Sequence, residues 1–262
     1  MAQRFFGKVV WITGAGSGLG KAMALEFARQ GAKLVLSGRR VERLEEVADA
    51  IKAQGGEALA VACDVADDES LKAAAHTACT HWGRLDVAVA NAGFGIQSSI
   101  EKLSFDEWRR QLDTNVIGLA LTARYALPAL RGAKGRLALV GSVMAMVPTP
   151  KVGAYTASKY AVRAIGQTLA MECAKDGVSC TTLHPGFVES EIGQIDRQGK
   201  FDANIRDQRP KHLMWTSERA AKVMVRAIHR RKREYVFTIH GKLAGFIGRH
   251  MPWLLHWALK LR

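Results

Sequence analysis

The chain has 262 residues, 48% of them hydrophobic, which is enough material for one continuous core. Its formal net charge of +14 is uneven, because residues 206–262 carry fourteen basic and three acidic side chains while the rest is nearly balanced. The four cysteines are too widely spaced for a disulfide framework, and the histidines are too scattered for a metal site. The sequence has no apolar run long enough for a plain membrane span, and its N-terminus does not resemble a signal peptide. We therefore expect a cytoplasmic protein with reduced thiols and no metal.

Short β-rich runs alternate with amphipathic stretches along most of the chain. Strands are predicted at Lys8–Thr13, Lys33–Ser37, Glu57–Ala62, Asp86–Ala90, Arg136–Gly141, Val178–His184 and Tyr235–Thr238. Helices are predicted at Gly20–Gln30, Val41–Ala53, Ser70–His81, Phe105–Leu130 and Ala154–Lys175. This alternation predicts an α/β fold with a single Rossmann-type, doubly wound parallel sheet of about seven strands and helices on both faces. We place one catalytic domain at residues 1–240 and a basic amphipathic extension at residues 241–262.

A glycine-rich loop follows the first predicted strand. Residues 13–20 read TGAGSGLG, and glycines at this spacing let the backbone turn sharply toward the start of a helix. The N–H groups at that helix start, together with the helix dipole, favour a bound pyrophosphate. A glycine-rich turn alone is weak evidence, but its position between a strand and a helix favours dinucleotide binding.

The residues at the end of the second predicted strand indicate whether NAD or NADP is bound. Gly38-Arg39-Arg40 stands where an NAD-binding protein has a carboxylate that accepts hydrogen bonds from the ribose 2′-hydroxyl. The planar, permanently charged guanidinium of arginine suits a phosphate instead. We therefore predict NADP(H) as the cofactor, with Arg39 on the 2′-phosphate and Arg40 as a weaker helper. The alternative is that both are solvated loop charges.

Three residues form the predicted catalytic group. Tyr155 and Lys159 are four residues apart on a predicted helix, so they project from one face, and Ser142 ends the preceding strand. A phenol with its ordinary pKa of about 10 is a poor base near neutral pH, and a nearby ammonium lowers that pKa. The spacing is common by chance, but here it follows a phosphate loop and opens a helix.

In residues 7–191 the chain resembles the classical short-chain dehydrogenase/reductase family, with the motifs in the family's order. The resemblance implies that a dinucleotide is bound by Gly14, Gly16, Ser17, Gly18, Leu19, Gly20, Asp64, Val65, Asn91, Ala92, Gly93, Pro185, Gly186, Val188 and Ser190, together with Tyr155 and Lys159. Asp64 would meet the adenine ring and the Val188 backbone would hold the carboxamide. Ala90 departs from the family, in which Asn is commoner.

The resemblance also implies catalytic roles. Tyr155 would protonate the carbonyl oxygen during reduction, and Ser142 would orient that oxygen. Lys159 would lower the pKa of Tyr155 and bind the nicotinamide ribose, while Asn115 would hold a water that connects Lys159 to solvent. The expected reaction interconverts a ketone and a secondary alcohol, with a steroid, a 3-oxo lipid or a similar lipophilic substrate. A homodimer or homotetramer is implied through residues 105–130 and 154–175.

Beyond Glu191 the sequence carries no motif with a chemical role common to this family. Residues 190–215 are predicted as a substrate loop that acts as a mobile lid, although an ordinary surface excursion fits its polarity almost as well. Apolar residues beside the motifs could line the substrate pocket or belong to the core, namely Phe94, Ile96, Met144, Met146 and Phe187.

The last residues combine apolar and basic side chains. From Pro252 onward, a helical projection gathers Trp253, Leu254, Trp257, Ala258 and Leu261 on one face, opposite His256 and Lys260. This face could cover a lipophilic pocket, pack on another subunit, or make a peripheral contact with an anionic membrane.

The sequence disfavours two other classes of function. A dinucleotide-binding sensor without turnover is disfavoured because both Tyr155 and Lys159 are present. Nucleic acid is not expected as a partner, because binding motifs are lacking and the positive charge coincides with an apolar helical face.

Overall fold

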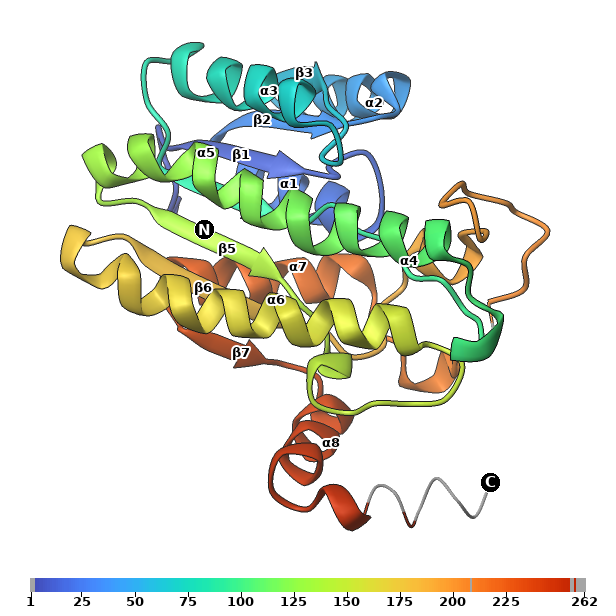
Figure 1. Ribbon diagram of the computed structural model, residues 1–262. Helices are drawn as coiled ribbons and strands as arrows, with labels where there is room; N and C mark the ends of the chain where they lie inside the picture. The colour runs from blue at the N-terminus through green and yellow to red at the C-terminus, as the bar shows by residue number, and fades with distance from the viewer. Residues whose placement is uncertain (1–2, 208, 255–256, 258–262) are drawn as a thin grey trace.

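The structure is a computed structural model that describes residues 3–207, 209–254 and 257. Within these residues one seven-stranded parallel sheet has the order β3-β2-β1-β4-β5-β6-β7 (Figure 1). The strands are β1 (Val9–Thr13), β2 (Lys33–Gly38), β3 (Glu57–Ala62), β4 (Val87–Ala90), β5 (Arg136–Val140), β6 (Ser179–His184) and β7 (Glu234–Val236). The predicted doubly wound parallel sheet is therefore confirmed.

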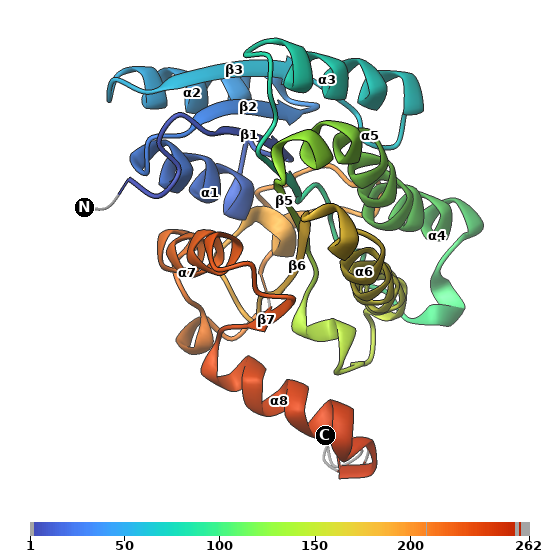
Figure 2. The ribbon, with the colours of Figure 1, turned by 90° about the vertical axis from the view of Figure 1, so that its left-hand side faces the viewer.

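Helices cover both faces of the sheet. They are α1 (Gly18–Arg29), α2 (Val41–Lys52), α3 (Asp68–Thr80), α4 (Phe105–Leu112), α5 (Gly118–Ala133), α6 (Gly153–Glu172), α7 (Ser217–His229) and α8 (Ile239–His250). Figure 2 shows α1, α2 and α7 on one side of the sheet and α3, α5 and α6 on the other. The described residues include no helix that is both long and apolar enough to cross a bilayer.

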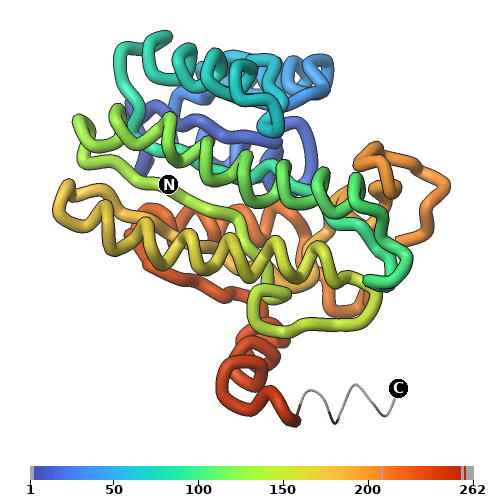
Figure 3. Tube along the Cα trace, in the orientation of Figure 1, coloured from blue at the N-terminus to red at the C-terminus, as the bar shows by residue number. Residues whose placement is uncertain are grey.

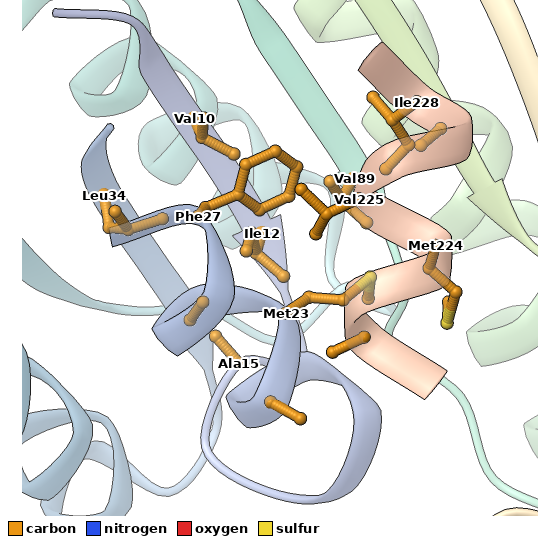
Figure 4. Close-up of a cluster of buried hydrophobic side chains, with 14 of the residues drawn as sticks. Val10, Ile12, Ala15, Met23, Phe27, Leu34, Val89, Met224, Val225 and Ile228 are labelled. Atoms are coloured by element: carbon orange, nitrogen blue, oxygen red, sulfur yellow. The ribbon is translucent and has the colours of Figure 1, made fainter. Parts of the chain in front are cut away.

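The strand sequences explain this layering. Every residue of β1 is buried, as expected for a strand covered on both faces. Val10 and Ile12 point into the core beneath α1 and α7, whereas Val9 and Trp11 point into the core beneath α3 and α5. Figure 4 shows Phe27 of α1 packed among side chains of β1 and α7. One alternating strand thus supports two separate cores.

Two helical segments differ from the prediction. The stretch predicted as one helix at 105–130 is interrupted by a π-helical turn at Asp113–Ile117. Helix α7 was not among the predicted elements.

The tail also differs. Helix α8 begins at Ile239, before the predicted domain boundary and well before the helix predicted from Pro252. Residues Pro252–Leu254 and Trp257 are helical as well. The remaining members of that predicted face, Ala258 and Leu261, and the residues predicted opposite it, His256 and Lys260, lie outside the described residues.

The strand order places a crevice at one end of the sheet. The chain runs from β1 outward to β2 and β3, and then returns to the other side of β1 for β4. The connections after β1 and β4 therefore diverge, and ligands of open α/β sheets bind at such a point outside the carboxyl ends of the strands. Figure 3 shows residues 190–215, drawn in orange, beyond these strand ends and close to α4.

Candidate active site

The glycine loop and the turn after β4 are packed directly against each other at this crevice. Gly14 has a φ of +67°, and a Cβ there would lie 2.9 Å from the Cα of Ala92. A Cβ on Gly20 would lie 2.1 Å from the Gly14 carbonyl oxygen. The Asn91 amide donates to the carbonyl oxygens of Thr13, at 2.9 Å, and of Gly14, at 3.1 Å. The structure therefore requires glycine at both positions and assigns Asn91 to holding the loop.

The first turn of α1 fits an anionic group. Ser17 precedes the helix but makes no side-chain cap, and the turn contains no acidic residue, so its N–H groups and dipole have no anionic partner there. Gly18 has a φ of +49°, and a Cβ there would lie 3.1 Å from the Ser190 Cβ. Gly16 lies against the Arg43 side chain, and Leu19 is half-buried against the core. This cradle suits a dinucleotide pyrophosphate.

Both predicted phosphate-binding arginines lie beside this loop. Arg39 donates to the Gly199 carbonyl oxygen at 3.2 Å and has no acidic partner among the described residues. Arg40 donates to Ser17 Oγ at 3.1 Å and pairs with the Glu191 carboxylate at 2.7 Å. Arg39 therefore keeps its full charge for a phosphate, while the charge of Arg40 is partly neutralised.

The residues predicted near the adenine follow β3. Asp64 accepts a hydrogen bond from the Ala66 N–H at 3.0 Å, and its own N–H donates to Ser70 Oγ at 3.0 Å. Val65 is buried against Gly118, where a Cβ would lie 2.6 Å from the Val65 carbonyl oxygen. These contacts fix the Asp64 carboxylate at the edge of the crevice.

Asn115 occupies the π-helical turn and is almost fully buried. Its Oδ1 accepts from the Phe94 N–H at 3.0 Å, and its Nδ2 donates to the Phe94 carbonyl at 2.8 Å and to Ser158 Oγ at 3.0 Å. A Cβ on Gly93 would lie 3.0 Å from Asn115 Oδ1. Asn115 thus clamps the chain after β4 to α6, directly beside Lys159.

Ser142, Tyr155 and Lys159 come together as predicted. Ser142 follows β5, and its Oγ accepts from the Met144 N–H at 3.1 Å. Tyr155 and Lys159 lie one turn apart on α6, with the ammonium 5.6 Å from the centre of the phenol ring. The Lys159 Nζ donates to the Val140 carbonyl oxygen at 2.9 Å. A hydroxyl, a phenol and an amine therefore share one corner of the crevice.

Burial governs the titration of this group. Burial raises the pKa of Tyr155, and a hydrogen bond with Ser142 and the positive charge of Arg209 partly offset that rise. Burial also lowers the pKa of Lys159 to about 8. Arg209, a residue that the sequence did not single out, therefore adds a positive charge that lowers the pKa of Tyr155.

The loop after β6 contains the predicted nicotinamide-binding residues. Pro185 accepts a backbone hydrogen bond from Val143 at 2.9 Å, which joins this loop to the segment that follows Ser142. A Cβ on Gly186 would lie 2.3 Å from Thr238 Oγ1. The Phe187 N–H donates to His240 Nε2 at 3.1 Å. The start of α8 thus packs against the loop that is predicted to bind the nicotinamide.

Arg209 crosses the same loop from the substrate-loop side. Its guanidinium donates to the carbonyl oxygens of Val188, at 2.9 Å, and of Ser190, at 2.8 Å, and pairs with Asp207 at 2.7 Å. Sequence reasoning had given Arg209 no role beyond the polarity of residues 190–215. It joins the cofactor loop to the substrate loop next to Tyr155.

The substrate loop is anchored at both sides of the crevice. Arg197 pairs with Glu107 at the start of α4 and donates to the Lys102 carbonyl oxygen at 2.8 Å. The hydrogen bond from Arg197 is the main reason that the pKa of Glu107 falls to about 2. At the opposite side, Glu191 and Gly199 contact the two arginines after β2. Residues 190–215 therefore span the site from α4 to the phosphate-binding end.

The candidate pocket residues fall into two groups. Ile96 and Met146 are buried, and so is Phe94, whose ring lies 3.5 Å from the position of a Cβ on Gly199. Met144 and Phe187 are half-buried beside Ser142 and the nicotinamide loop. The last two can contact a substrate directly, while the first three shape the surroundings.

The chain has clear relatives. The short chain dehydrogenase family profile matches residues 8–200. An 11-beta-hydroxysteroid dehydrogenase A of Sesamum indicum is 34% identical over 266 residues, which cover 97% of this chain and 75% of that protein. A cyclohexanol dehydrogenase of Acinetobacter sp. (strain SE19) is 35% identical over 194 residues, covering 73% of this chain and 77% of its own length.

Solved structures agree with this. A short chain dehydrogenase/reductase from Burkholderia phymatum in complex with NAD superimposes with a TM-score of 0.85 at 28% identity, covering 97% of this chain and 96% of its own. A short chain dehydrogenase from Burkholderia cenocepacia J2315 in complex with NADP gives a TM-score of 0.78 at 25% identity, covering 88% and 96%.

Proposed function

The chain belongs to the short-chain dehydrogenase/reductase family and is an oxidoreductase of hydroxyl and ketone groups, and from this premise we propose that it interconverts a lipophilic ketone and its secondary alcohol with NADP(H). The observation that carries the cofactor assignment is Arg39, a cation at the end of β2 without an acidic partner in the described part of the chain. Arginine binds phosphate well, and a 2′-phosphate distinguishes NADP from NAD. Related structures hold either dinucleotide, so the arginine decides our choice.

The chain's own residues handle the proton. When bound, the nicotinamide ring supplies or accepts the hydride. In ketone reduction Tyr155 donates its phenolic proton to the carbonyl oxygen, and the Ser142 hydroxyl orients that oxygen through a hydrogen bond. Lys159 binds the ribose of the dinucleotide and keeps a positive charge near the phenol. Asn115 holds the Phe94 segment and Ser158, the residue before Lys159, in place.

A lipophilic substrate fits the half-buried apolar side chains beside the site. Met144 follows Ser142, and Phe187 stacks on His240 with ring centres 5.4 Å apart. Two of the relatives described above act, by their names, on a hydroxysteroid and on cyclohexanol, which are both cyclic secondary alcohols. We therefore propose a cyclic or long-chain ketone rather than a short polar one.

We also propose a homodimer or homotetramer formed through α4, α5 and α6. Large apolar side chains are exposed on or between these helices, namely Phe105, Ile117, Tyr160 and Met171. Contacts between subunits would remove this apolar surface from water.

The test is a panel of ketones, from short polar to long or polycyclic ones, with NADPH or NADH consumption followed by absorbance. We expect turnover of lipophilic ketones with NADPH, and a ten- to a hundredfold weaker use of NADH, on the order of one to two charge-assisted hydrogen bonds. Arg39→Asp should remove or reverse this preference, whereas Lys52→Asp, an exposed change at the far end of α2, should leave it intact. Equal use of both dinucleotides by the unmodified protein would contradict the cofactor assignment. Tight dinucleotide binding without turnover of any ketone or alcohol would favour a sensor instead.

A further inference from the structure

Helix α8 is held rigidly against the segment that follows the catalytic serine. Three glycines form its inner face. A Cβ on Gly245 would lie 3.0 Å from Met146 Sδ, and one on Gly248 would lie 2.1 Å from the Met146 carbonyl oxygen. At the start of the helix, Thr238 Oγ1 accepts from the Gly241 N–H at 3.2 Å. This close packing fixes which face of α8 points outward. Figure 2 shows the helix extending away from the sheet below β7.

The outward face is strongly apolar. Ile239, Leu243 and Phe246 are 79%, 63% and 58% exposed, and Trp253 and Trp257 continue the series at 66% and 63%. Within α8 these positions are spaced by four and three residues, which places them on one side of a helix. Leaving five large apolar side chains in water is costly, and such a patch marks an interaction surface.

The same region is strongly basic and has no acidic side chain beyond β7. No Asp or Glu follows Glu234 in the sequence. A cavity of about 220 Å³ between α8 and Met146 is lined by Lys242, Phe246, Arg249 and His250, among others. Arg249 pairs with Glu234 at 2.6 Å, whereas Lys242 has no acidic partner among the described residues. Cationic groups therefore border the apolar face.

We propose that α8 and the helical residues after it form a docking surface for an anionic phospholipid bilayer. The apolar side chains enter the boundary between headgroups and acyl chains, where tryptophan is favoured, and Lys242 and His250 face the lipid phosphates. A second copy of the chain is a poorer occupant, because a two-fold interface would bring the same basic groups of both copies together. The proposal does not depend on the identity of the substrate.

The test is co-sedimentation of the full chain with vesicles of phosphatidylcholine alone and with vesicles in which part of it is replaced by phosphatidylglycerol. We expect binding to the anionic vesicles that weakens as salt is added. The double variant Leu243→Ser/Phe246→Ser and the single variant Lys242→Glu should each reduce the bound fraction by about tenfold or more. Turnover of a water-soluble ketone should stay unchanged in both.

Matched controls come from the opposite end of the molecule. Phe6 is 73% exposed and the Lys72 side chain is 59% exposed, so Phe6→Ser and Lys72→Glu make the same chemical changes away from α8. Both controls should bind vesicles like the unmodified chain. The proposal is wrong if the unmodified chain binds neither vesicle, binds both equally, or loses binding in the controls as well. It is also wrong if the double variant changes only the oligomeric mass in sedimentation velocity, because α8 would then join two copies.

Discussion

The imidazole Nδ1 of His184 lies 2.9 Å from the backbone carbonyl oxygen of Ser142. The other ring nitrogen lies 3.0 Å from Glu234 Oε1, and this carboxylate also pairs with Arg163 and Arg249. Burial alone would raise the pKa of Glu234, but hydrogen bonds from His184 and Arg163 outweigh it and lower the pKa to about 2. A polar network thus reaches from α6 and α8 to Ser142, for which we propose the role of orienting the substrate.

We expect His184 to be a positioning residue for Ser142. His184→Gln can keep one of the two contacts and should lower kcat about threefold, whereas His184→Phe, which keeps neither, should lower it about tenfold. The dissociation constant for NADPH should stay the same, because His184 does not line the dinucleotide cradle. If dinucleotide affinity and kcat fall together, the residue supports only the fold.

Tyr155→Phe removes the transferable proton and the hydrogen bond to Ser142 with little change in shape. We expect kcat for ketone reduction to fall by about a hundredfold or more, as for loss of a general acid. NADPH binding, followed by fluorescence titration, should be retained. Tyr160→Phe is the matched control on the exposed side of α6 and should keep full turnover. Substantial turnover by Tyr155→Phe would remove the tyrosine from the mechanism.

Arg209 should set the pH dependence of alcohol oxidation. Its positive charge favours the phenolate of Tyr155, so Arg209→Gln should raise the pKa of that group. The rising limb of kcat/KM for alcohol oxidation should therefore move to higher pH. Arg209→Lys keeps the charge and should show a smaller shift, and Arg206→Gln, an exposed neighbour, should show none. An unchanged profile in Arg209→Gln would show that its charge does not reach the phenol.

The Glu191 carboxylate should lower the affinity for NADPH, because it neutralises part of the charge of Arg40. Glu191→Gln frees that guanidinium and removes a negative charge near the 2′-phosphate. Because both side chains are partly exposed, we expect only about a threefold lower dissociation constant for NADPH, with NADH unaffected. Glu189→Gln, two residues away and exposed, serves as the control. Equal effects on both dinucleotides would show that the pair acts on the loop rather than on the phosphate.

Lys159 should make the folded protein less stable at neutral pH than a neutral residue would. Its pKa is about 8 in the folded state and 10.5 when unperturbed, so the charged form is disfavoured by folding. That cost is fully present below pH 8 and disappears as the pH rises to 10.5. It corresponds to about 3 kcal/mol, reduced by about 1 kcal/mol for the hydrogen bond to Val140.

The variant Lys159→Met, which we expect to be inactive, should accordingly unfold at a higher denaturant concentration than the parent at pH 7. The difference should shrink between pH 8 and pH 10.5, measured without dinucleotide, since the parent gains stability there and the variant does not. Lys151→Met, an exposed change, should give no such pH-dependent difference. A variant that is less stable than the parent at every pH would contradict the expectation.

Much of the fold and of the site could be predicted because their signals are local. Short runs of β-forming, mostly apolar residues predict the strands, and the glycine spacing after the first run predicts the cradle. Helix α7 also carries a local signal, with Thr216 as an N-cap and apolar residues at helical spacing, and it should have been recognised. Its basic surroundings obscured an ordinary amphipathic helix.

The remainder depends on contacts between distant residues. Arg40 and Glu191 are 151 positions apart, and His184 meets Ser142 across 42, so neither pairing has a signature in the sequence. The contribution of Arg209 also depends on such a contact. The i and i+4 spacing predicts the Lys159 amine beside Tyr155, but only the folded chain brings the charge of Arg209 to the phenol as well.

The π-helical turn sets the orientation of α5 relative to α4, so the number of residues between Phe105 and Ala133 matters for the fold. An α-helix rotates about 100° per residue, so deleting one residue while the π-helical turn is kept would turn α5 by about that angle relative to α4. Leu119, Ala123 and Leu130 would then leave the core beneath the sheet. Substitutions can accumulate in this region, whereas deletions or insertions of one residue cannot. Natural and engineered length changes should instead concentrate in surface turns such as Gly55 and Gly83, where nothing lies within 4 Å of an added Cβ.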